Sequence, residues 1–231
     1  MPSGCSSVEV YRGAAARRGL DARKNARKCD TWDVDDTRAD ETVSVEARTV
    51  VLVEGTSDRI ALETLSRRLG RNLEGEGVSV VPMGGVQAIG RQLATLGPPQ
   101  GQRVFGLYDV REENLVRRSL EQVGVTDVGI ALTRGEMEEL GFYACVMDLE
   151  DELIRALGSQ AVEEVIESEG QLPSFHTLQK QLPWRGQTVE AQLHRFLGSG
   201  AYRKIRYARL LVEALELKRV PRPLNQLLAR L

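Results

Sequence analysis

From Thr49 onward, short apolar runs alternate with stretches that carry apolar residues at helical spacing. The run Thr49-Val-Val-Leu-Val53 is β-branched and apolar throughout, which is typical of a strand buried on both faces of a parallel sheet. Further strands are predicted at 78–82, 103–108 and 141–146, and an amphipathic helix follows each of them. Right-handed crossovers place such helices on the faces of a parallel sheet. The alternation therefore predicts an α/β fold with a mainly parallel sheet of about four strands.

The regions on either side of this alternation have a different texture. Residues 1–47 hold a basic stretch followed by an acidic one, with few large apolar residues, which predicts a disordered or weakly helical arm. After Gly158 the pattern predicts only helices, at about 160–169, 190–197, 202–217 and 222–231. We therefore expect an α/β domain at 48–158 and an all-helical extension at 159–231 that packs on it.

The composition excludes several classes of protein. No apolar run in the 231 residues approaches the roughly 20 residues needed to cross a bilayer. The basic residues near the N-terminus are not followed by the apolar segment of a secretory signal, so we expect a cytoplasmic protein without membrane contact. Three widely spaced cysteines without a CxxC pattern argue against a disulfide framework and against a structural zinc site.

Acidic side chains follow three of the four predicted strands, at the edge where an open parallel sheet binds its ligands. They are Glu54 and Asp58, then Asp109, Glu112 and Glu113, then Asp148, Glu150, Asp151 and Glu152. Like charges gathered at one edge repel one another unless protons or cations intervene, and Mg²⁺ or Mn²⁺ prefers oxygen ligands. Acidic residues at helix N-termini also complement the helix dipole, so that interpretation stays open for Glu112, Glu113, Glu150 and Asp151.

The C-terminal part of the chain is basic. From His176 to Leu231 there are eleven Lys and Arg residues against three Asp and Glu. Four of these cations lie in one short run and predict contact with a nucleic-acid backbone, and they are Arg203, Lys204, Arg206 and Arg209. A solvated helix face is the alternative interpretation of the same run.

Three of these segments together resemble a known family. Val51-Leu-Val-Glu-Gly-Thr-Ser-Asp58, then Val-Pro-Met-Gly-Gly85, then Leu-Tyr-Asp109-Val-Arg111 looks like a Toprim domain. The VEGxxD pattern, with Asp-Leu-Glu-Asp-Glu152 later, resembles the Toprim portion of the overcoming-lysogenization-defect (OLD) nucleases and a related group of standalone actinobacterial Toprim proteins. The resemblance covers roughly residues 49–217. It implies a Rossmann-like sheet and a Mg²⁺ site made by a glutamate after the first strand and an Asp-x-Asp after the third.

The resemblance also assigns roles to individual acidic residues. Glu54 matches the family glutamate, Asp58 the second acidic position of the nuclease branch, and Asp109 the first aspartate of the Asp-x-Asp. Arg111 stands where the second aspartate is expected, and an arginine does not ligate a cation. Glu112 or Glu113 would then have to reach the metal instead.

Two later segments complete the set that the resemblance implies. Glu150 and Glu152 lie where the nuclease branch places a further acidic ligand. Lys204 resembles its late lysine, which is suited to stabilising charge that develops on a phosphate, and Lys180 is the competing candidate.

The function implied is a Mg²⁺- or Mn²⁺-dependent hydrolase of phosphodiester bonds in nucleic acid, in particular an endonuclease acting on DNA. Two alternatives stay open: a degenerate Toprim module that binds nucleic acid or a partner ATPase without cutting, and a Toprim nucleotidyl transferase, because one scaffold hosts both chemistries. The sequence has no Walker A pattern, so any ATPase would be a separate partner. The oligomeric state, a homodimer included, also stays open.

Overall fold

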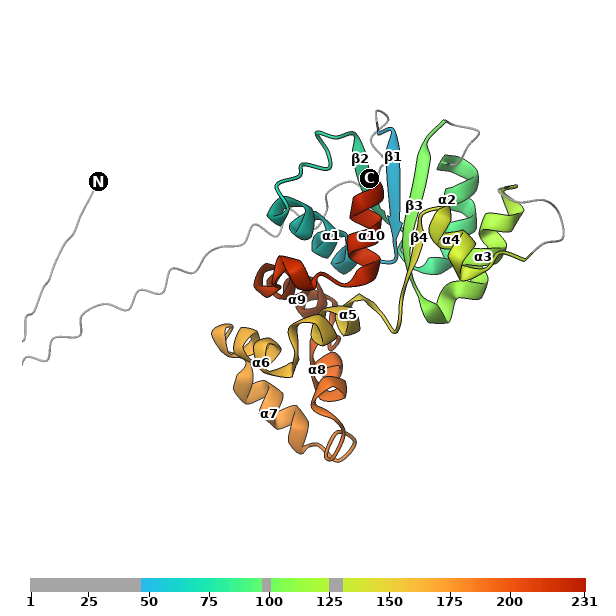
Figure 1. The fold of residues 1–231 in the computed structure, drawn as a ribbon. Coiled ribbons are helices and arrows are strands. Elements are labelled where there is room, and N and C mark those ends of the chain that lie inside the picture. Colours follow the sequence, from blue (N-terminus) through green and yellow to red (C-terminus); the bar gives the residue numbers. More distant parts are fainter. Residues whose placement is uncertain (1–46, 97–100, 125–130) are drawn as a thin grey trace, which may run out of the picture. The chain divides into compact units, whose positions relative to one another are not determined.

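A four-stranded parallel sheet lies at the centre of the computed structural model, which describes residues 47–96, 101–124 and 131–231 (Figure 1). Its strands are β1 (Thr49–Val53), β2 (Val78–Pro82), β3 (Arg103–Asp109) and β4 (Phe142–Cys145), in the order β2-β1-β3-β4. Every neighbouring pair is parallel, so the predicted fold class is confirmed. The arm predicted for 1–47 lies outside the described residues, apart from Ala47.

Both faces of the sheet are covered by helices, as the continuous apolar strand β1 requires. All five residues of β1 are buried. Val51 and Val53 join the core under α1 (Thr56–Arg68), and Val50 and Leu52 join the core on the opposite face. That second core is closed by three helices, α2 (Ile89–Leu96), α3 (Glu113–Gln122) and α4 (Arg134–Glu139).

The chain after β4 is helical in the described residues, as predicted. Its helices are α5 (Leu149–Leu157), α6 (Ser159–Ser168), α7 (Leu172–Lys180), α8 (Val189–Leu197), α9 (Ala201–Ala214) and α10 (Arg222–Arg230). Two helices were not predicted, α4 and α7. The helix predicted at 202–217 ends at Ala214, and a 3₁₀ turn follows at Leu217–Arg219.

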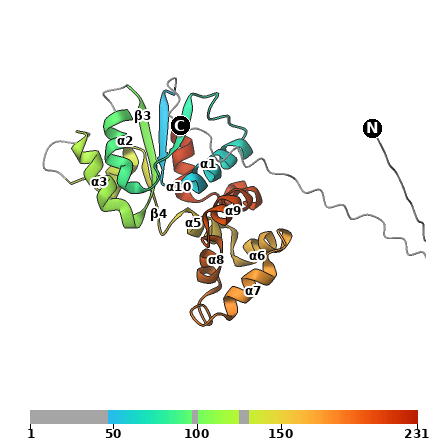
Figure 2. The same cartoon turned by 180° about the vertical axis from the view of Figure 1, so that it is seen from behind.

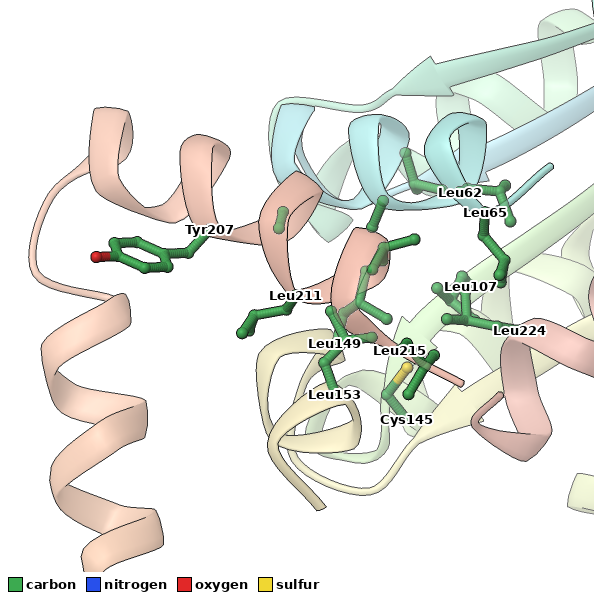
Figure 3. Packing of buried hydrophobic residues seen from close by; sticks show 14 of the residues in the cluster. Leu62, Leu65, Leu107, Cys145, Leu149, Leu153, Tyr207, Leu211, Leu215 and Leu224 are labelled. Atoms are coloured by element: carbon green, nitrogen blue, oxygen red, sulfur yellow. The ribbon is translucent and has the colours of Figure 1, made fainter. Parts of the chain in front are cut away.

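The last helices pack on the sheet domain through a shared hydrophobic core, and the view from behind shows the same arrangement (Figure 2). In Figure 3, Leu211 of α9 and the C-cap residue Leu215 lie near Leu149 and Leu153 of α5, and α1 contributes Leu62 and Leu65 to the same core. The Arg68 side chain of α1 donates a hydrogen bond of 2.6 Å to the carbonyl oxygen of Val212, in the last turn of α9. The domain boundary at 158/159 stays a prediction, because one core runs through the residues on both sides of it.

Candidate functional site

Glu54 and Asp109 lie at the same edge of the sheet, because β1 and β3 are neighbouring parallel strands. Glu54 is exposed directly after β1, and Asp109 is the half-buried last residue of β3. The loop after β2 also holds the end of β1. The amide of Met83 donates to the carbonyl of Val53 at 2.8 Å, and that of Gly85 donates to the carbonyl of Glu54 at 3.2 Å.

Asp58 lies one turn inside α1 and is almost fully buried, with 8% of its surface exposed. Its Oδ2 accepts a hydrogen bond of 2.8 Å from the amide of Gly55, the N-cap residue, so one of its roles is to cap the helix. The pKa of Asp58 is nevertheless raised to about 6, mainly by burial and also by the charges of Glu54 and Asp148, against the opposing effect of Lys204. Capping therefore leaves a carboxyl group that still carries an unfavourable charge.

Asp109 has the most strongly shifted carboxyl group at this edge. Burial raises its pKa to about 8, and the charges of Glu54, Asp148 and Asp58 add to the shift, while Lys204 opposes it. These four side chains lie near enough to act on one another, and we call Glu54, Asp58, Asp109 and Asp148 the carboxylate cluster. Such mutual repulsion is relieved by a proton or by a bound cation.

Asp148 was one of the acidic residues predicted at this edge, but no role as a metal ligand was predicted for it from the sequence. It is the N-cap of α5, and its Oδ1 accepts from the amide of Asp151 at 2.9 Å. Its Oδ2 lies 2.6 Å from Nε2 of His194, a residue of α8. Burial alone would raise the pKa of Asp148, but the hydrogen bonds from His194 and Asp151 outweigh it and lower the pKa below its ordinary value.

Glu150 and Lys204 form a pair beside the carboxylate cluster. Glu150 is 3% exposed, and its Oε2 lies 3.2 Å from Nζ of Lys204 on α9. Burial raises the pKa of Glu150 to about 7, against the opposing charge of Lys204. Neither oxygen of Glu150 accepts a well-oriented hydrogen bond from the described residues. The ammonium of Lys204 also acts on Asp58 and Asp148, so this lysine is the cation that the cluster shares.

Other predicted site residues are held by partners of their own. Glu113 accepts from Arg117 at 2.5 Å and from Nε of Arg134 at 2.7 Å. Glu152 accepts from the amide of Val146 at 2.9 Å and pairs with Arg155 at 2.8 Å. Both carboxylates are thus compensated within the fold.

Two residues that follow Asp109 are not engaged with it. Arg111 is exposed, and within the described residues no ion pair joins it to Glu54 or Asp109. Glu112 lies in the same 3₁₀ turn, Val110–Glu112, and is not among the charges that act most strongly on Asp109. An exposed arginine therefore lies at this edge of the site, where the family pattern has an aspartate.

The arginines of α9 also have partners inside the protein. Arg203 stacks over the ring of Phe196 at 4.3 Å, Arg206 pairs with Glu169, and Arg209 lies 3.8 Å from Glu213. Contact of these arginines with nucleic acid, as predicted, would require them to exchange those partners for phosphates.

The donor set fits a hard divalent cation, although it does not form a closed cage. Within 47–96, 101–124 and 131–231, no three His, Cys, Asp or Glu side chains are gathered closely enough to hold a metal ion by themselves. Mg²⁺ in proteins is commonly held by one or two carboxylates together with waters and substrate phosphates. The uncompensated carboxyl groups of Asp58 and Asp109 are suited to that open form of binding.

Comparisons with known proteins agree with this geometry. A family model described as "Overcoming lysogenization defect protein-like, TOPRIM domain" matches residues 47–100, which include β1, α1 and the loop after β2. Residues 47–100 are those of an OLD-like Toprim domain. This confirms the family resemblance that the sequence motifs predicted.

Solved structures of OLD proteins share the fold of this chain. The C-terminal region of the Burkholderia pseudomallei OLD protein superposes with a TM-score of 0.58 at 22% identity, over 80% of this chain and 96% of that one. The C-terminal region of the Xanthomonas campestris pv. campestris OLD protein gives 0.57 at 22% identity, over 80% and 95%. These identities establish a common fold and no more. A search of curated protein sequences gives no significant match.

One contact at the site was not predicted from the sequence, the pairing of Asp148 with His194. Asp148 was visible as an acidic residue after the fourth strand, but its partner lies 46 residues later in the chain. A side chain that is brought into a site by a distant helix leaves no local pattern in the sequence.

Within the described ranges, none of the helices has the length and apolarity needed to cross a membrane.

Proposed function

We propose that this OLD-like Toprim domain is a Mg²⁺- or Mn²⁺-dependent endonuclease that hydrolyses phosphodiester bonds in DNA. The observation that carries the proposal is the carboxylate cluster, in which Asp109 has a pKa of about 8 and Asp58 a pKa of about 6. Groups whose charge is left uncompensated at the ligand-binding edge of a parallel sheet are typical of functional sites.

Individual residues would divide the work as follows. Glu54 and Asp109 would hold the cation from the ends of β1 and β3, with Asp58 and Asp148 on its flank. Lys204, kept beside the cluster by Glu150 at 3.2 Å, would place its ammonium against the charge that develops on the phosphate. The exposed Arg111 would contact a neighbouring phosphate of the backbone. When bound, the metal supplies an activated water and stabilises the leaving oxygen.

A second candidate function is favoured by Arg111. A Toprim module with an arginine in place of the second aspartate could bind nucleic acid or a partner ATPase without cutting. Its DNA binding would weaken with salt and would not respond to a chelator. Cleavage and chelator response therefore separate the two candidates.

The test is to incubate the purified full chain with supercoiled and single-stranded DNA in the presence of Mg²⁺ or Mn²⁺. We expect nicking or cleavage that EDTA stops. Glu54→Gln should lower the cleavage rate by at least about 100-fold, because losing a direct metal ligand should cost at least as much as losing a residue that orients one. Uptake of Mn²⁺, measured by calorimetry, should weaken in the same variant.

The matched control is Glu113→Gln, which makes the same substitution at a carboxylate already paired with Arg117 and Arg134. This variant should cut DNA within about threefold of the unmodified chain, because its partners are structural. Cleavage that survives Glu54→Gln, or a chain that takes up no Mn²⁺, would reject the nuclease and leave the binding module.

A further inference from the structure

His194 belongs to the helical part of the chain yet touches the carboxylate cluster. It lies in the last turn of α8, and its Nε2 is 2.6 Å from Oδ2 of Asp148. A carboxylate only accepts hydrogen bonds, so Nε2 carries the donated proton. The other oxygen of Asp148 accepts from the amide of Asp151 at 2.9 Å. Both oxygens are therefore held, and the plane of the carboxylate is fixed.

The backbone that carries His194 is held in place by packing. Its neighbours on α8, Leu193, Phe196 and Leu197, are buried in the same core as Leu149 at the start of α5. Thr188 caps the start of α8 by accepting from the amide of Ala191 at 3.3 Å. The anchored backbone of α8 therefore keeps the Cα of His194 within reach of Asp148.

A nearby ion pair shows what a purely structural contact looks like. Arg155 donates to Asp151 at 2.7 Å on the outer side of the same helix α5. Asp151 is not among the charges that act most strongly on Asp58 or Asp109, whereas Asp148 acts on both. The histidine thus holds the N-cap residue of α5, whose charge acts on the carboxylate cluster.

We propose that His194 is a positioning residue that orients Asp148 toward Glu54, Asp58 and Asp109, so that the helical part of the chain completes the metal-binding site. Residues that orient metal ligands through a hydrogen bond are a general feature of metal sites. The inference rests on the proposed function, because it assumes that the carboxylate cluster binds a divalent cation.

The experiment measures Mn²⁺ binding to the full chain by calorimetry and by the loss of the free-ion signal in electron paramagnetic resonance. Removing the donor in His194→Ala should weaken binding by roughly 10- to 100-fold, the usual effect of losing such an outer partner. His194→Gln keeps an N–H donor and should recover a large part of that affinity. Thermal unfolding of each variant shows whether the fold is intact.

Two controls separate positioning from general damage. Arg155→Gln breaks the neighbouring structural pair and should leave Mn²⁺ affinity within about threefold, as expected for an exposed ion pair. In a double-mutant cycle, His194→Ala should cause no further loss once Asp148→Asn is present, because it acts only through that carboxylate.

Each outcome decides one claim. If the unmodified chain binds Mn²⁺ and His194→Ala binds it equally well, the positioning role is wrong while the proposed function stands. The same conclusion follows if folded Ala and Gln variants lose affinity equally, or if Arg155→Gln loses as much. If the unmodified chain binds no Mn²⁺, the proposed function fails and the inference falls with it.

Discussion

Asp109 and Glu113 stand four residues apart at the same edge of the sheet, and the fold treats them in opposite ways. Within the described part of the chain no ion pair joins Asp109 to a cation, and burial together with three neighbouring carboxylates raises its pKa to about 8. Glu113 accepts from two arginines, Arg117 and Arg134. A position at this edge of the sheet therefore does not by itself indicate a functional carboxylate. The lack of a counter-charge does.

The contrast between Asp109 and Glu113 is tested most strongly by varying the pH. Because the pKa of Asp109 is raised, this carboxyl group keeps its proton until about pH 8, and a metal ion must displace that proton to bind. Affinity for Mn²⁺ should therefore rise with pH, by roughly 50-fold between pH 6 and pH 8 for a single group of this pKa. Calorimetry across this range measures the slope.

Two variants show which carboxylate sets that slope. Asp109→Asn should flatten the pH dependence as well as weaken binding, because the titrating group is gone. Glu113→Gln should leave the slope unchanged, since its carboxylate is held by arginines and does not face the cluster. A slope that persists in Asp109→Asn would assign the proton to another group.

Arg111 also tests whether counter-charge decides function at this edge, because it is an arginine without an ion pair among the described residues. Arg111→Asp restores the Asp-x-Asp spacing and replaces a positive charge by a negative one two residues from Asp109. Mn²⁺ affinity should increase by about tenfold, as expected for a change of charge near a partly solvated site. Cleavage should not rise in proportion if Arg111 contacts a substrate phosphate.

The control for net charge is Arg118→Asp, at an exposed position of α3. It changes the charge of the chain by the same amount without restoring the Asp-x-Asp spacing, so its effect on Mn²⁺ affinity should be small and should vanish in salt. Equal gains from Arg118→Asp and Arg111→Asp would show that only the total charge matters.

The fold was largely predictable because its signals are local. The buried run of β1 and the glycine and charge that follow it specify a parallel strand and a turn, and the strand order then brings Glu54 and Asp109 to one edge. Helix α7 was not predicted, and it carries Pro173 in its first turn, where a proline is tolerated.

The pairing of the site was not predictable, because it depends on residues far apart in the chain. Arg134 reaches Glu113 across 21 positions, and His194 reaches Asp148 across 46. The sequence shows which residue types are present at the rim, and only the packing of α3, α4, α5 and α8 decides which of them keep an uncompensated charge.

Replacing Asp109 and replacing Glu113 should change the free energy of unfolding in opposite directions, and these changes should be small. The folded-state pKa of Asp109 lies above its ordinary value, so its contribution to stability is present at acidic pH and is lost as pH rises toward 8. Without metal at pH 8.5, Asp109→Asn should raise the free energy of unfolding by about 1 kcal/mol, a gain that shrinks at pH 5. Glu113→Gln should lower it by about 0.5 kcal/mol, because it removes a favourable ion pair. Urea denaturation of both variants at the two pH values measures this, and a loss of stability in both at pH 8.5 would mean that Asp109 is compensated after all.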